Sequence, residues 1–228
     1  TGSLVASAAV FFAPSLLLIA AYPVREMIKR GWITANAKSM DEELAKFFGV
    51  ESADKIDSFP HAAKKTNAGA AATPVQIAWL HRVKQIASGM LAARYSPDSV
   101  RSAVGVLSTL LISPEAARKV PRIMAEAGIR FVLAESLPGA KIDGVCFWLD
   151  DSSPVVALSC RYDRIDNFWF VLRHECEHVV RLHGQTEPIL DAELEGERAG
   201  VGDTVTEEER VANSAGAEFC VPQDKLGK

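Results

Sequence analysis

The sequence predicts an α+β protein, in which a helical N-terminal part is followed by a small sheet and two C-terminal helices. Two observations predict this class. Before Gly128, apolar residues recur at helical spacing behind Ser-Pro and Thr-Pro starts, whereas residues 129–160 are rich in β-branched and aromatic residues. The 228 residues, 48% hydrophobic and 24% charged, are enough for a buried core and exclude a wholly disordered chain.

Residues 1–60 form the first expected region, a helical segment. Residues 4–22 carry no charge, and their length suits a membrane span or a signal, but Pro14 interrupts them and favours two short buried helices. Residues 23–33 predict a helix that begins at a proline and ends at a glycine, and a capping box at 39–42 opens the next helix. One interpretation makes this region the remnant of a DNA-binding region, although its acidic and basic residues are nearly balanced.

A linker is expected over residues 61–73, which are small and polar. The region 74–128 is predicted to be helical throughout. Its first helix begins at the Thr-Pro pair before residue 74 and runs to about residue 95. Ser96 and Ser113, each followed by a proline, are expected to start two further helices.

The region 129–228 is expected to form one domain that contains the sheet and the two last helices. Short strands separated by Asp-Gly and Asp/Ser/Pro turns predict a small, mostly antiparallel sheet. The apolar run that follows the sheet, without Gly or Pro, predicts a buried helix. The predicted strands are 129–134, 145–149 and 155–160, and the predicted helices are 167–183 and 207–221.

Composition limits the classes of function. The formal net charge of −4 argues against a protein that coats nucleic acid, so DNA contact would need a segment N-terminal to this chain. Four cysteines without a CxxC pair suit the reducing cytosol, and a cytoplasmic location is expected, with no membrane partner. The oligomeric state is left open.

The motif that carries chemistry is His-Glu-Cys-Glu-His at residues 174–178, an H-E-x-x-H match on the predicted helix 167–183. His174 and His178 are four residues apart, so they share a helix face and can bind one Zn²⁺ through neutral imidazoles. Glu175 is predicted to be the general base that takes a proton from a water activated by the metal. The rest of this helix is apolar, so these polar groups are costly there unless they have a function.

A third metal ligand is expected further along the chain, and three candidates are open. His183 follows His178 by five residues, one short of the spacing in the long metzincin motif, and is interpreted as an end-of-helix residue. The acidic stretch 187–197 lacks a clear pattern. Glu209 is the preferred candidate, because it lies on a second predicted helix together with a polar partner.

That partner is Asn213, which follows Glu209 by four residues. A ligand carboxylate and an amide that supports it would therefore face the same site. Glu207 and Glu208 precede Glu209 directly and are alternatives for the third ligand.

Other polar residues near the motif have a structural interpretation beside a functional one. The charged cluster 161–166 is expected to form loop salt bridges and the start of the motif helix. In the functional alternative, Tyr162 or Arg161 stabilises the oxyanion of a tetrahedral intermediate. Cys176 is expected to be a small buried hydrophobe, and Glu177 either faces solvent or adds negative charge to the site.

A family resemblance adds to this interpretation. The segment LPGAKIDGVCFWLDDSSPVVALSCRYDRIDNFWFVLRHECEHVVRLHG and the later ERVANSAGAEFCVP are similar to the ImmA/IrrE family of zinc metallopeptidase-like domains. They resemble in particular the C-terminal domain of XRE/HigA-type regulators and antitoxins, over about residues 115–224. The resemblance implies a minimal zincin fold, with Zn²⁺ ligands at His174, His178 and Glu209 and a general base at Glu175.

Two functions follow as expectations. The first is a zinc-dependent metallo-endopeptidase that hydrolyses a peptide bond of a regulatory, repressor-type protein. The second is a non-enzymatic transcriptional regulator or antitoxin in which the zincin fold serves as a sensor module. Fold alone does not decide between them. The retained Glu175 favours the enzyme, since a purely structural zinc site needs no base.

Overall fold

The computed structural model describes most of the chain, as residues 21–35, 39–58, 64–65, 72–192, 194 and 206–222. The expectations for residues 4–20, and for all of the linker except 64–65 and 72–73, lie outside the described residues. The chain divides into two compact units, residues 1–60 and 61–228. Within the described part, no helix is both long and apolar enough to cross a membrane.

The first unit contains the helices α2 (Val24–Lys29) and α3 (Met40–Phe48) and a 3₁₀ helix, Ala53–Ser58. The predicted cap of α3 is present, because the amide of Glu42 donates to the Ser39 hydroxyl at 3.4 Å. The apolar face of α3 is buried, and its members are Leu44, Ala45, Phe47 and Phe48.

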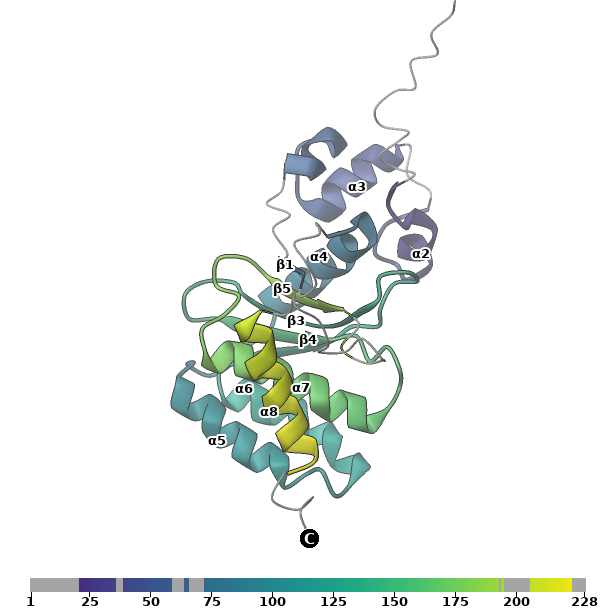
Figure 1. The fold of residues 1–228 in the computed structure, drawn as a ribbon. Coiled ribbons are helices and arrows are strands. Elements are labelled where there is room, and N and C mark those ends of the chain that lie inside the picture. Colours follow the sequence, from purple (N-terminus) through teal and green to yellow (C-terminus); the bar gives the residue numbers. More distant parts are fainter. Residues whose placement is uncertain are drawn as a thin grey trace, which may run out of the picture. The chain divides into compact units, whose positions relative to one another are not determined.

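In the second unit, a run of helices is followed by three consecutive strands and then by two helices with a short strand between them (Figure 1). Its helices are α4 (Pro74–Ser88), α5 (Pro97–Ser108), the 3₁₀ helix Pro114–Lys119, α6 (Val120–Glu126), α7 (Ile165–Val180) and α8 (Glu207–Cys220). Its strands are β1 (Lys64–Lys65), β2 (Arg130–Leu133), β3 (Ile142–Trp148), β4 (Pro154–Leu158) and β5 (Ile189–Ala192). The predicted α+β class is confirmed.

Helix α4 is shorter than predicted, since it ends at Ser88 rather than near residue 95. The segment after it bonds to other elements instead of continuing the helix. The amide of Ala93 donates to the Ala125 carbonyl at 2.8 Å, and the Tyr95 hydroxyl contacts the Val179 carbonyl at 3.2 Å. These tertiary hydrogen bonds replace the helical ones that apolar spacing alone predicted.

The sheet is mixed, and the expectation of an antiparallel sheet is wrong in this respect. Its five strands have the order β1-β5-β3-β4-β2, in which β3 pairs antiparallel with β4 and β5, while β2–β4 and β1–β5 are parallel. The reason is the connection over residues 134–141, which lets the β3–β4 hairpin enter the sheet with β4, not β3, beside β2. Strands β1 and β5 were not among the predicted strands.

A second correction concerns Asp143 and Gly144, which lie inside β3 and not in a turn between strands. The β3–β5 pairing is irregular between Ile142 and Gly144, as in a β-bulge. An added Cβ on Gly144 would lie 2.0 Å from Oε1 of Glu175. The glycine is thus needed for close packing of the motif helix against the strand, not for a turn.

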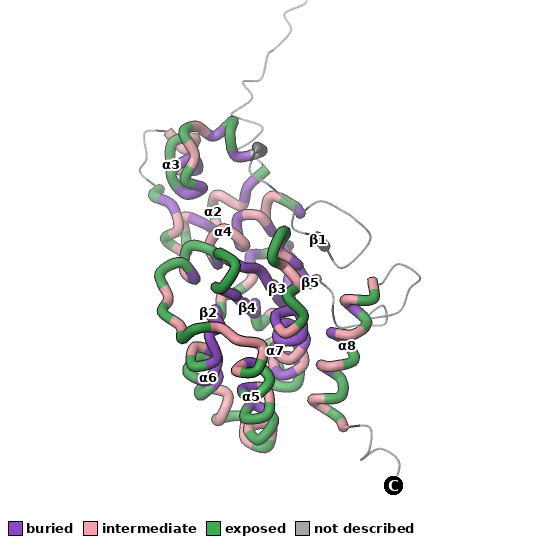
Figure 2. The backbone as a smooth tube through the Cα atoms, turned by 90° about the vertical axis from the view of Figure 1, so that its left-hand side faces the viewer, coloured by how far each residue is buried: buried purple, intermediate pink, exposed green. Residues whose placement is uncertain are grey.

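Helices cover both faces of the sheet, with α4 on one side and α5 to α8 on the other (Figure 1). Every residue of β3 and β4 is accordingly buried, and α7 is buried along most of its length (Figure 2). The side that carries α5 to α8 holds an apolar core, which includes Val100, Met124, Phe131, Val156, Trp169 and Leu172. This core fixes α7 on β3 and so positions its histidines.

Candidate metal centre

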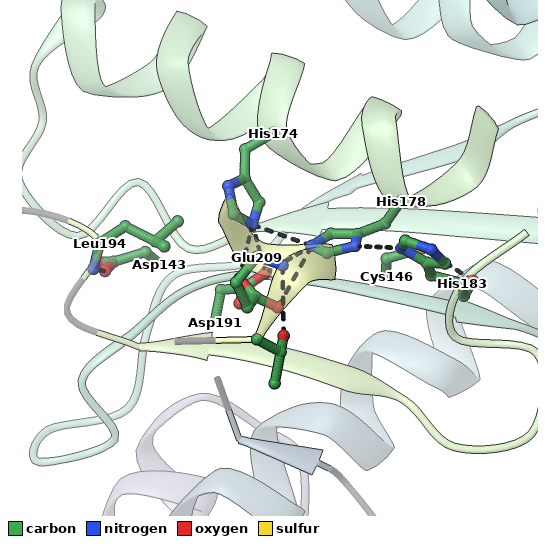
Figure 3. A network of polar contacts seen from close by, with 9 residues as sticks. Asp143, Cys146, His174, His178, His183, Asp191, Leu194 and Glu209 are labelled. Carbon is green, nitrogen blue, oxygen red and sulfur yellow. Dashed lines mark hydrogen bonds and ion pairs between the residues drawn. The ribbon is translucent and has the colours of Figure 1, made fainter. Parts of the chain in front are cut away.

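Helix α7 brings the two histidines of the motif together as the spacing predicted. His174 and His178 are both 0% exposed, and their Nε2 atoms lie 3.0 Å apart. Two neutral imidazole nitrogens at this distance cannot both present lone pairs to each other without a shared proton or cation. Their common direction therefore marks a point to which further groups converge (Figure 3).

Two carboxylates from other elements reach that point. Asp191 lies on β5, where it pairs with Gly144 of β3. Glu209 lies in the first turn of α8, a helix whose start is capped by the Thr206 hydroxyl. Asp191 is 0% and Glu209 is 2% exposed. The group therefore joins three successive elements of the chain, α7, β5 and α8.

The distances fit one metal ion. Oδ2 of Asp191 lies 3.1 Å from Nε2 of His174 and 3.8 Å from Nε2 of His178. The Glu209 oxygens lie 3.5 and 3.6 Å from the same two nitrogens, and the four ligand atoms all lie within 4.8 Å of one another. Ligands at zinc-type bond lengths in a tetrahedron are separated by about 3.4 Å. The group His174, His178, Asp191 and Glu209 could hold a metal ion.

The protonation state of His178 favours metal binding as well. Burial lowers the pKa of His178 to about 3, although the Asp191 carboxylate opposes this shift. The imidazole is therefore neutral at physiological pH, which is the form that binds metals. Two nitrogen and two oxygen ligands suit a divalent transition ion, and such an ion would neutralise the two buried carboxylates.

His183 contacts the imidazole of His178 on the side away from the metal group. Nδ1 of His183 lies 3.0 Å from Nδ1 of His178, which leaves Nε2 of His178 for the metal group (Figure 3). The His183 carbonyl in turn accepts from the indole N–H of Trp148 at 2.9 Å. The interpretation of His183 as an end-of-helix residue missed this role, because i+5 spacing on an ideal helix would point it elsewhere. Leu182, with a φ of 60°, ends the helical path and turns the ring back.

Glu175 is a buried carboxylate that lacks hydrogen-bond donors among the described residues. Its side chain is 0% exposed, and neither carboxylate oxygen accepts a hydrogen bond from a described residue. Burial, followed by the negative charges of Asp191 and Glu209, raises the pKa of Glu175 well above its usual range, and the Asp191 carboxyl is close enough to share a proton. Such a group is costly in a folded protein unless a function requires it.

The two middle residues of the motif face away from the metal group. Glu177 binds Arg173 at 2.7 Å and Arg181 at 2.6 Å, both four residues away on α7. Burial opposes its ionisation, but the two arginines outweigh burial and lower the pKa of Glu177. Cys176 is 1% exposed, and burial raises its pKa to about 12, so it is a thiol and not a nucleophile.

The remaining candidates lie at different places. Glu207 is exposed and Glu208 is half-buried, so the phase of α8 gives the metal group Glu209 alone of the three. Asn213 lies one turn after Glu209 and is half-buried, without a side-chain hydrogen bond to a described residue. Tyr162 lies in the turn before α7, where the Arg161 guanidinium contacts its ring at 4.9 Å; no described contact joins it to the metal group.

Asp191 is the residue of this group that sequence reasoning missed. It belongs to the acidic stretch 187–197 that was a candidate without a pattern. The signal was Ile-Leu-Asp-Ala at residues 189–192, a short strand in which an acid follows two apolar residues. Comparison of the chain with protein-family models, with curated proteins and with solved structures gave no match.

Proposed function

We propose that this chain is a zinc-dependent metallo-endopeptidase with a minimal zincin fold, which cleaves a regulatory protein in the cytoplasm. The observation that carries the proposal is the Glu175 carboxylate, buried and without a hydrogen bond from a described residue, beside a group that could hold a metal ion. A structural metal site would be more stable with an apolar residue at that position. The resemblance to the ImmA/IrrE family supports a repressor-type protein as the substrate.

The residues have distinct parts in the reaction. His174, His178 and Glu209 would hold the ion. When bound, zinc supplies Lewis acidity, which polarises a peptide carbonyl and makes water more acidic. The Glu175 carboxylate takes a proton from the attacking water and then donates it to the nitrogen of the leaving amine. Burial raises the pKa of Glu175 in the metal-free chain, and the charge of a bound cation would favour its carboxylate form.

A second candidate function is a non-enzymatic regulator in which the metal site is a sensor or structural element. One observation favours it: four protein side chains, all nearly fully buried, surround the candidate position, as in closed structural sites. The two functions differ in whether Glu175 is needed.

The test combines metal content with hydrolysis. The purified chain, its H174A and E209A variants and its E175Q variant are analysed for metals by mass spectrometry and incubated with a peptide library. We expect about one zinc per chain in wild type and E175Q, a loss of at least about tenfold in H174A and E209A, and cleavage by wild type that E175Q abolishes. Absence of metal under zinc-replete conditions, or equal cleavage by E175Q, would contradict the proposal.

A further inference from the structure

We propose that Asp191 is a displaceable fourth ligand that closes the metal site and keeps the peptidase latent. The coordination part of this inference depends on the geometry of the four side chains. The latency part also rests on the proposed function. Both parts concern the strand β5, which sequence analysis did not predict.

The number of protein ligands distinguishes catalytic zinc sites from structural ones. Catalytic zinc sites bind the ion through three protein side chains and keep one position open, whereas structural sites use four. Here Asp191 approaches the two imidazole nitrogens to 3.1 and 3.8 Å, as closely as Glu209 does at 3.5 and 3.6 Å. Asp191 is thus as close to the imidazoles as Glu209 is, and the four side chains together supply the number of ligands of a closed site.

The presence of Glu175 is not explained by a metal site that four protein ligands close. A site with four protein ligands has no position for a substrate oxygen, and therefore no use for a base. Yet Glu175 is retained in the same buried space, where its oxygens meet the carboxyl of Asp191 and not an N–H donor of a described residue. Both features are explained if Asp191 leaves the fourth position when a substrate carbonyl or water enters.

The strand β5, which carries Asp191, pairs with different neighbours along its length. At Ile189 and Leu190 the strand has a neighbour on each side, since these residues pair with Lys64 and Lys65 of β1 as well as with β3. Asp191 pairs with Gly144 of β3, next to the irregular register between Ile142 and Gly144. The β3–β5 pairing is therefore least regular beside the ligand. A small change there would withdraw the carboxylate and leave His174, His178 and Glu209 in place.

The experiment uses Co²⁺ in place of zinc, because its visible d–d absorption depends on the number and kind of ligands. Wild type, D191A and D191N are loaded with Co²⁺ and titrated with azide, a small anion that binds an open coordination position. D143N is the matched control, since Asp143 is also a buried carboxylate on the sheet but binds the backbone amide of Leu194 at 2.8 Å. Circular dichroism establishes whether each variant is folded. If D191A is not folded, D191N is used in the azide titration in its place.

We expect azide to leave the spectra of wild type and D143N unchanged and to change those of D191A and D191N, with at least about tenfold higher apparent affinity. Zinc should bind at least about tenfold more weakly to D191A. Peptide cleavage per metal-loaded chain should rise at least about tenfold in D191A and be lost in the D191A/E175Q double variant.

Azide binding to wild type as tight as to D191A would overturn the inference, because the fourth position would then be open. The proposed function fails in a different way. If azide binds D191A and not wild type, but neither chain cleaves peptides, Asp191 remains a closing ligand while latency and the peptidase are both rejected. Closure would then belong to a structural or sensor site.

Discussion

Glu175 and Glu177 are two residues apart on the same helix, and their surroundings are opposite. Glu177 is bridged by Arg173 and Arg181, each within one helical turn, and its pKa is lowered. Glu175 has no hydrogen bond from a described residue, lies near Asp191 and Glu209, and has a raised pKa. The difference shows that local i±4 pairing satisfies one face of α7, while the other face is satisfied only through groups from distant parts of the chain.

This contrast separates a stabilising carboxylate from a reactive one. A paired glutamate has its charge stabilised before any ligand binds, so it gains little from a metal or a substrate. An unpaired buried glutamate costs stability in the folded chain and is available for proton transfer. Variants of the two positions therefore test the assignment directly.

The largest expected effect is on catalysis. E175Q should lower peptide cleavage by about 10²- to 10⁴-fold while zinc content stays the same, because the amide cannot accept the proton. E177Q should change cleavage by less than about threefold, since its side chain binds arginines on the other face. Cleavage rates per bound zinc give the comparison, and a similar loss in both variants would contradict it.

The next effect concerns the space that Glu175 occupies. G144A should lower the free energy of unfolding by about 1–3 kcal/mol, because the new Cβ would lie 2.0 Å from Oε1 of Glu175 and 2.8 Å from Val171. Urea unfolding of the metal-free chain measures the change.

The control for this prediction is G105A, on the exposed face of α5, where an added Cβ meets nothing within 4 Å. It should raise the free energy of unfolding by about 0.5–1 kcal/mol, as alanine favours a helix over glycine. If G144A is as well tolerated as G105A, the close approach of β3 and Glu175 is not a constraint.

A third prediction uses the opposite pKa shifts of the two glutamates in the metal-free chain. The pKa of Glu175 is raised, so between 4.5 and the folded pKa the native state holds a proton that the unfolded state has lost. This contribution to stability is present below pH 4.5 and is lost as pH rises, by up to about 1.4 kcal/mol per pH unit. The pKa of Glu177 is lowered, so its contribution is present above pH 4.5 and is lost as pH falls.

Unfolding free energies measured from pH 3 to 9 with wild type, E175Q and E177Q test these signs. Above pH 4.5, the free energy of unfolding of E175Q should fall less steeply with pH than that of wild type. On acidification, the free energy of unfolding of E177Q should fall less than that of wild type. Unchanged slopes in both variants would mean that neither glutamate has the surroundings described.

The smallest effect concerns Cys176, which lies between the two glutamates. Burial raises its pKa to about 12, and it should react with a thiol reagent only when the chain unfolds. Cys160 is exposed and should be labelled first. Mass spectrometry of partly labelled chain identifies the modified residue, and the C160S variant should lack the fast phase. Fast labelling of Cys176 in folded protein would give it a role beyond packing.

Much of the local structure could be predicted from the sequence. Thr73 and Ser96 form the capping boxes that open α4 and α5, because a cap needs only residues that are neighbours along the chain. The i, i+4 spacing of His174 and His178 likewise places both rings on one helix face without any tertiary information. The sheet was predicted less well, since strand order depends on which edges meet in space.

For the site, the spacing of residues along the chain was enough to predict the two imidazoles, the adjacent Glu175 and a second acidic helix. Packing of separate elements decides which of the three glutamates at 207–209 points inward and brings Asp191 into the group, whereas the pairing of Glu177 with two arginines is local to α7. The two kinds of feature differ in how far apart along the chain the contacting residues lie. Helical phase and caps depend on contacts within a turn, whereas a metal group is assembled by packing α7, β5 and α8 around one point, and their separation along the chain leaves no periodic signal.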